Sequence, residues 1–147
     1  MFKNDNSKAT GKLTIEIKND KGTVIETREV KNLVVDAGLD YIASRMKDTT
    51  ATAMSHMAIG TGSTAAAAAD TTLGTEADRN ALTSTTVTDN AVAYVASFAA
   101  GEGTGAITEA GIFNASSGGT MLCRTVFSVV NKGASDAMTI TWTVTIS

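Results

Sequence analysis

The chain has 147 residues, of which 43% are hydrophobic, and its formal net charge is −3. This length fits a single domain over 1–147 with a sizeable core, and the composition is too apolar and too weakly charged for a disordered chain. No apolar run approaches the about 20 residues that span a bilayer. The polar start, Met1–Asn6, is unlike a signal peptide. We therefore expect a globular domain with no membrane partner.

Charge and composition narrow the partners and the fold class further. Only three of the twelve basic residues lie beyond Lys47, so the basic patch that binds nucleic-acid phosphates is missing and no nucleic-acid partner is expected. The single Cys123 excludes a disulfide within one chain. The 24 Thr and 23 Ala residues favour a sheet with a closely packed interior over a helical bundle.

The first elements in chain order are a polar arm over 1–10 and a β-hairpin over 11–31. Apolar residues alternate with polar ones from Leu13 to Ile17, and Asn19–Gly22 supplies the turn. After the hairpin, Asp36 is a candidate cap for a short helix. Its apolar residues follow the helical spacing i, i+3, i+4 and i+7, and they are Leu39, Ile42, Ala43 and Met46.

Short strands dominate the rest of the chain. Turn signals at Asp89–Asn90 and at Asn114–Gly119 separate them, and the run Ala65–Ala69 is predicted to be a surface loop or a short helical turn. The predicted strands are His56–Gly60, Leu82–Thr88, Ala91–Ala99, Ala106–Phe113, Thr120–Val130 and a last one that contains Met138 to Ile146. The chain is therefore expected to be all-β, a β-sandwich of seven to eight strands with one short helix after the N-terminal hairpin and its core over 32–147.

The last strand has the cleanest alternation in the chain. One face carries Met138, Ile140, Trp142, Val144 and Ile146, and the other carries the threonines Thr139, Thr141, Thr143 and Thr145. Ice binding would need such a ladder on several strands, and only one shows it in the sequence. A solvated face and a subunit contact are weighed equally, because residues 1–48 hold 17 charged side chains and residues 49–147 only 10.

No catalytic, cofactor or metal site is predicted. Gly60–Thr64 lacks the ending of a phosphate-binding loop and Gly101–Gly105 lacks the third glycine of a dinucleotide fingerprint, so both are interpreted as turns that need positive φ. His56 has no acidic neighbours with which to bind a metal. Cys123 lies in an apolar segment without an activating base and is expected to be buried and inert.

Three charged residues are interpreted as structural rather than catalytic. Glu76 and Arg79 lie in the only charge cluster of their region, and Glu109 stands alone among small and apolar residues. A carboxylate at this position can pair with Arg79 or Arg124 across a sheet or a subunit boundary. We expect Arg79 to bind Glu109 or Glu76 and so hold the long loop onto the sandwich.

The order of several segments resembles small virion proteins of tailed bacteriophages, a group of tail-fibre, tail-collar and head-decoration proteins. The resemblance runs from residue 32 to residue 146 and leaves out residues 1–31, whose hairpin is a candidate attachment element. It is carried by Asn32–Leu39, His56–Gly62, Leu73–Arg79, Ile107–Phe113, Gly119–Arg124 and the closing Thr-Ile-Thr-Trp-Thr-Val-Thr-Ile.

The resemblance implies a non-enzymatic structural protein of the virion, assembled in the bacterial host cytoplasm. The lack of heptads or shaft repeats favours an exterior capsid decoration or cement protein. Its partners would be other virion proteins and further copies of itself, a homotrimer being one arrangement. The alternatives are a tail-fibre or tail adaptor module that binds host glycans through Gly101–Gly105 or Ala65–Asp70, and a cell-wall hydrolase, for which the sequence offers no pair of flanking carboxylates.

Overall fold

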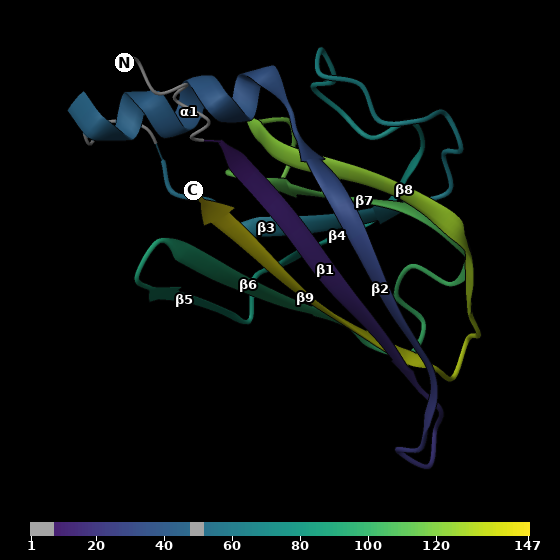
Figure 1. The fold of residues 1–147 in the computed structure, drawn as a ribbon. Helices are drawn as coiled ribbons and strands as arrows, with labels where there is room; N and C mark the ends of the chain where they lie inside the picture. The colour runs from purple at the N-terminus through teal and green to yellow at the C-terminus, as the bar shows by residue number, and fades with distance from the viewer. Residues whose placement is uncertain (1–7, 48–51) are drawn as a thin grey trace.

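The computed structural model describes residues 8–47 and 52–147, which form nine strands and one helix (Figure 1). The all-β class, with a single short helix after the N-terminal hairpin, is confirmed. No described helix has the length and apolar character needed to cross a membrane. The elements are β1 Ala9–Lys18, β2 Val24–Val34, α1 Asp36–Lys47, β3 His56–Gly60, β4 Glu76–Ala81, β5 Ser84–Thr88, β6 Ala91–Phe98, β7 Gly105–Phe113, β8 Met121–Lys132 and β9 Ala137–Ile146.

The nine strands belong to one curled sheet in the order β4-β3-β7-β8-β2-β1-β9-β6-β5. Every neighbouring pair is antiparallel. The strand count exceeds the predicted seven to eight, because the charged segment Glu76–Ala81 forms β4. The division into two separate sheets that defines a sandwich is not confirmed, since β2 joins both parts of the sheet through its pairing with β8.

The core lies in the concave interior of the curled sheet. Its residues come from β1, β6 and β9 on one side and from β3, β7 and β8 on the other. The alternation predicted for the last strand holds, because Met138, Ile140 and Trp142 are fully buried while Thr141 is exposed. Burial of one face and solvation of the other is the reason that this strand shows a period of two.

β7 differs from β9 because both of its faces are covered. From Ile107 to Phe113 every residue is buried. Ala110 and Ile112 contact the main core, whereas Phe113 belongs to a second, smaller cluster with Leu73. Leu73 comes from the long segment between β3 and β4, so this segment covers the outer face of β7 and places polar groups above it.

The N-terminal hairpin occupies the middle of the sheet. β1 pairs along its whole length with β9, and from Gly11 to Lys18 it also pairs with β2. The ladder between β2 and β8 contains only Leu33 and Val34 of β2, and side chains bridge the rest of the gap. Arg28 donates to the carbonyl and hydroxyl oxygens of Ser128 at 2.8 and 2.9 Å.

Helix α1 lies across one end of the sheet (Figure 1), and its contact is tighter than the sequence suggests. Gly38 is its buried residue, and a Cβ at this position would lie 2.0 Å from the carbonyl oxygen of Leu122. The predicted apolar stripe does not coincide with the buried face: Leu39 is 44% and Met46 is 87% exposed. Ile42 is the member of the stripe that packs against the core.

Candidate functional site

Glu109 of β7 is a buried carboxylate that accepts hydrogen bonds from more donors than any other described carboxylate does. Its side chain lies beneath segment 61–75 and is inaccessible to solvent. Oε1 accepts from the backbone N–H groups of Gly62 and Thr75 at 2.9 and 2.7 Å, and Oε2 accepts from that of Gly74 at 2.8 Å. The carboxylate therefore holds both ends of the long segment onto the sheet.

Arg124 of β8 neutralises this carboxylate from the neighbouring strand. Its Nε and Nη2 donate to Oε2 of Glu109 at 3.2 and 2.9 Å, and its Nη1 donates to Asp70 at 2.7 Å. Nη2 and Nη1 also donate to the carbonyl oxygens of Thr64 and Ala65. The guanidinium thus uses its planar set of donors to connect two carboxylates and the loop backbone.

The charged forms of both acids are favoured in this cluster. Burial by itself raises the pKa of Glu109. The N–H donors of the loop and Arg124 lower the pKa by more than burial raises it, so it lies below its ordinary value. The pKa of Asp70 is lowered in the same way, because the N–H of Ala67 and Arg124 outweigh the effect of burial. Glu109 and Asp70 are therefore ionised and paired at neutral pH, which makes Glu109 unsuited to act as a proton donor or acceptor.

The glycines of the Gly60–Thr64 motif serve close approach rather than positive φ. Their φ angles are not positive, in contrast to Gly101, Gly103 and Gly105. A Cβ on Gly62 would lie 2.5 Å from Oε1 of Glu109, and one on Gly60 would lie 2.3 Å from a backbone oxygen. The prediction that these glycines are needed for positive φ was therefore wrong, because they instead make room for a carboxylate.

A second polar contact forms around Arg79 of β4. The guanidinium donates to both carboxylate oxygens of Glu76, at 3.2 and 2.6 Å, and lies 3.8 Å above the ring of Phe113. Its Nη1 also donates to the carbonyl oxygens of Ala115 and Gly118. Arg79 therefore fixes the turn that follows β7, and the aromatic ring adds a cation–π contact.

The three residues proposed to form a structural pairing occur in two separate contacts. Arg79 binds Glu76, and Glu109 binds Arg124, so Arg79 and Glu109 are not partners in the described structure. Arg79 holds the turn after β7, while Arg124 and Glu109 hold the long segment. Both contacts join loops to strands, and neither leaves an unpaired charge facing an open cavity.

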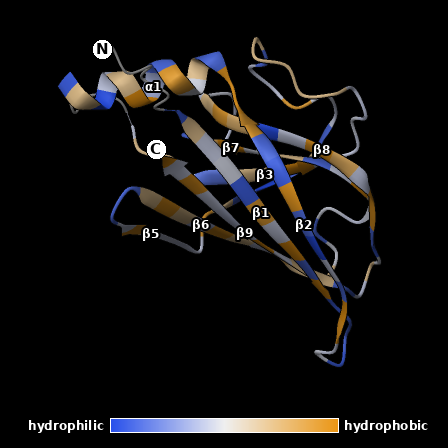
Figure 2. Cartoon of the chain, in the orientation of Figure 1, coloured by the Kyte–Doolittle hydropathy of each residue, from blue (hydrophilic) through white to orange (hydrophobic). Residues whose placement is uncertain are grey.

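The threonines of β9 lie on a broad uncharged face. In the register of the sheet, the outward residues of β6 stand beside them and those of β5 lie one strand further. In Figure 2 these strands carry little of the blue that marks hydrophilic residues in β2. We name this set the Thr face; it consists of Ser84, Thr86, Thr88, Ala91, Ala93, Val95, Ser97, Thr139, Thr141, Thr143 and Thr145, none of which is buried.

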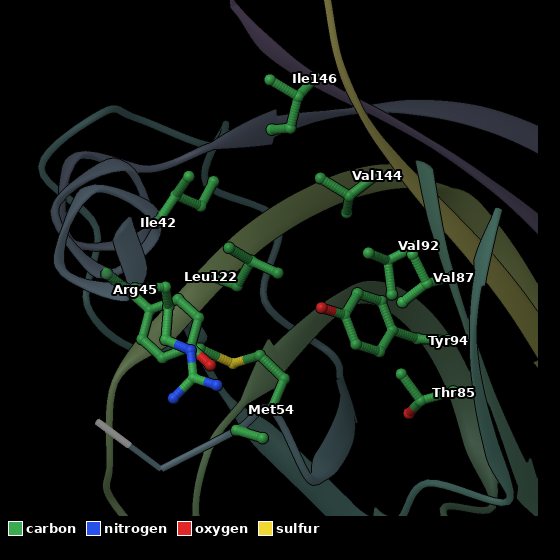
Figure 3. Close-up of a pocket in the computed structure, with 12 residues that line it drawn as sticks. Ile42, Arg45, Met54, Thr85, Val87, Val92, Tyr94, Leu122, Val144 and Ile146 are labelled. Atoms are coloured by element: carbon green, nitrogen blue, oxygen red, sulfur yellow. The ribbon is translucent and has the colours of Figure 1, made fainter. Parts of the chain in front are cut away.

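An apolar pocket of about 380 Å³ opens between α1 and the opposite, inner face of the same strands (Figure 3). Val87 and Tyr94 form one wall, Leu122 the floor, and Met54 and Ile42 the other side. The lining contains few polar atoms. The pocket is the open end of the curled sheet, where no strand of residues 8–47 or 52–147 covers the core.

Tyr94 supplies a polar group to this pocket. Its hydroxyl points toward the space enclosed by the apolar side chains (Figure 3), although the residue is only 8% exposed. Burial, with smaller contributions from Tyr41 and Cys123, raises the pKa of Tyr94 to about 12. The phenol is therefore neutral at physiological pH, with a hydroxyl that can donate a hydrogen bond in the pocket.

His56 and Cys123, the remaining candidates from the sequence, and the buried Lys132, which the sequence analysis did not single out, lie in structural surroundings. His56 at the start of β3 lies beside the hydroxyl of Ser55, with 2.8 Å between Nδ1 and Oγ. Burial raises the pKa of Cys123 well above its ordinary value, so the thiol is protonated. Lys132 is buried and donates to the carbonyl oxygens of Ala99 and Asp136 at 2.9 and 2.7 Å. Among the described residues, no group of three His, Cys, Asp or Glu side chains is placed to bind a metal.

No protein-family model, curated protein or solved structure matches the chain. Within the described structure, the Thr face is unusual for a protein surface because its exposed and half-buried residues include no charge.

Sequence reasoning missed the pairing of Asp70 with Arg124, and it missed the pocket. Asp70 follows a run of five alanines and precedes two threonines, and its partner Arg124 lies 54 residues away. The pocket combines α1, the hairpin of β5 and β6, and β9, three parts that are distant from one another in the chain. β4 has no clear alternation, because Asp78, Arg79 and Asn80 are three consecutive polar residues, so the sequence indicates only a charge cluster there.

Proposed function

We propose that the chain is a non-enzymatic structural protein of a tailed-phage virion, most simply an exterior decoration protein that stabilises the capsid through contacts between subunits. The Thr face is the observation that carries this proposal. Eleven outward residues on three strands, none of them buried, include no charge and no side chain larger than valine. Such a surface can approach a neighbouring protein closely without the desolvation of charged groups.

The composition of the face supports a contact rather than a merely solvated surface. On the same side of the sheet, β1 and β2 carry charged residues such as Lys12 and Glu29, which form an exposed ion pair at 3.3 Å. The charged strands have the ordinary character of a surface in water. The change in composition from β1 to β9 would then mark the border between the solvated part and the covered part.

The internal polar contacts fit a building element of this kind. Glu109, Arg124 and Asp70 fix the longest loop to the sheet, and no ionised residue of this cluster is left for chemistry. A rigid outer shape is useful to a protein that acts by shape and contact. Further copies of the chain and other virion proteins are the proposed partners, with a homotrimer as one arrangement, and the assembled virion is the proposed location.

A binding experiment with two matched variants tests the proposal. Thr141→Lys introduces a charge at the centre of the Thr face, and Thr27→Lys introduces the same charge at an exposed position on β2. Particles of the encoding phage that lack this protein are incubated with each variant, and bound protein is quantified by mass spectrometry. We expect the wild type and T27K to bind, and T141K to bind at least tenfold more weakly.

The copy number in intact virions separates the placements. A number comparable with that of the major capsid protein supports decoration, whereas a few copies per particle indicate the tail adaptor or adhesin. Absence of the protein from purified virions contradicts the proposal as a whole.

A further inference from the structure

We infer that the edge strand β5 pairs with β5 of a second copy of this chain, forming a two-fold antiparallel contact that extends the sheet. This inference rests on the edge strand alone and does not depend on the proposed function. β5 is the last strand in the order of the sheet, and no described strand pairs with its outer side. In Figure 1 it lies at the free edge beyond β6.

Within the part of the chain that the structure describes, β5 lacks the features that normally prevent two edges from pairing. Natural edge strands carry charges, proline or a covering segment. The segment from Leu82 to Thr88 contains no charged residue and no proline, and all five residues of β5 are exposed. Val87, an apolar residue, is 70% exposed. Four of the five residues are Thr or Val, which favour the extended conformation.

The other edge of the sheet is protected in the way that β5 is not. β4 contains Glu76, Asp78 and Arg79 within six residues. Its Asn80 donates to the carbonyl oxygen of Ser97 on β6 at 2.9 Å, so β4 is fastened to the opposite side of the curled sheet. The contrast between the two edges singles out β5 as the surface for pairing.

The backbone of β5 has the alternation that a second strand requires. A two-residue turn joins β5 to β6, so Thr88 and Thr86 direct their backbone N–H and C=O groups toward β6. Thr85 and Val87 then direct theirs away from β6, off the free edge. These four groups per chain are the donors and acceptors that a second strand would satisfy.

A single register satisfies both the backbone and the two faces. An antiparallel pair centred on Thr86 places Ser84 opposite Thr88 of the second copy, and Thr85 opposite Val87 of the second copy. Each outward residue then meets an outward residue, and each residue that faces the pocket meets another that faces it. Thr85 and Val87 would exchange two hydrogen bonds with each other across the contact, four in all.

The second copy is the occupant because the edge complements itself. Although the whole chain carries a net charge of −3, no charges oppose each other in this register. The pairing continues the Thr face across both molecules. It also places Val87 of the second copy beside Thr85, on the side where the apolar pocket is open. The partner would therefore contribute a side chain to the wall of this pocket.

Two variants test the contact without disturbing β5–β6 pairing. Thr86→Lys puts two like charges opposite each other at the centre of the contact, where the paired side chains are closest. Val87→Pro removes an N–H that faces off the edge, and edge strands tolerate proline. Thr27→Lys adds the same charge at an exposed position on β2, away from the edge and outside the Thr face, and is the matched control.

Molar mass in solution gives the readout, by sedimentation equilibrium at protein concentrations up to about 100 µM, a range that detects micromolar to tens-of-micromolar dissociation constants. We expect the wild type and T27K to reach twice the chain mass of 15.1 kDa. The dissociation constant of the dimer should be at least about tenfold higher for T86K and for V87P than for the wild type. An equimolar mixture of T86K with T86E should form the dimer again. A monomeric wild type, or an oligomer that persists in both T86K and V87P, would overturn the inference. If the wild type forms the dimer but T141K binds particles as tightly as the wild type does, the proposed function fails while this inference stands.

Discussion

Replacement of Glu109 by Gln is the sharpest test of the buried polar cluster. The carboxylate accepts five hydrogen bonds, two at Oε1 and three at Oε2. Glutamine keeps the shape but has one acceptor oxygen, and its NH2 group must face at least two of these donors. Each buried donor left unsatisfied costs about 1–3 kcal/mol, and the loss of one member of a buried ion pair costs about 3–5 kcal/mol.

We therefore expect Glu109→Gln to lower the free energy of unfolding by about 3–5 kcal/mol. With a urea m value of about 2 kcal/mol/M, the unfolding midpoint falls by about 1.5–2.5 M. Trp142 is the only tryptophan and is fully buried, so its fluorescence reports the transition directly.

The control is the same substitution at an exposed ion pair. Glu29 has a side chain that is 63% exposed and lies 3.3 Å from Lys12. Glu29→Gln should change the free energy of unfolding by no more than about 0.5 kcal/mol. If Glu109→Gln also stays within about 1 kcal/mol of the wild type, the cluster does not hold the loop and the reasoning from hydrogen bonds to stability is refuted.

Three further predictions follow from other contacts. Because the pKa of Glu109 is lowered from 4.5 in the folded state, its contribution to stability is complete above pH 4.5 and is lost as the pH falls through the lowered pKa. Below pH 4.5 the urea midpoint of the wild type should therefore fall more steeply with pH than that of E109Q. Equal slopes for the two proteins would contradict this prediction. Gly38→Ala should lower the free energy of unfolding by about 1–3 kcal/mol, because the new Cβ would collide with the backbone of Leu122. Asp40→Ala on the same helix should leave the stability unchanged. A higher melting temperature for G38A would refute the close contact. Cys123 should react with a thiol reagent only in denaturant, and rapid labelling of the native protein would show that β8 opens.

The elements with one solvated face were predictable from sequence. β1 and β9 alternate because one side contacts the core and the other contacts water, and this alternation is visible at Leu13 to Ile17 as well as at Met138 to Ile146. β7 shows no such pattern because both of its faces are covered. The sequence therefore indicated β7 as a strand only through its flanking turns, and it gave no sign that the long loop covers it.

The polar contacts were predictable as residues but not as pairs. Glu109 stood out because an acid among small residues needs a partner when buried. Its partners, however, come from segments 34 to 47 residues away and from the next strand. Local patterns do not encode which of two arginines faces a carboxylate. Topology decides this, because β8 is the neighbour of β7 and β4 is not.

The position of β9 has a consequence for the order of folding. β9 is the last strand in chain order, yet it lies between β1 and β6, and backbone hydrogen bonds join Lys8 to Ser147. While the chain is being synthesised, β1 and β6 each lack a neighbour until β9 has left the ribosome. The core residues on those strands lack the cover of β9 during that time, so the complete core forms only once this strand has been made.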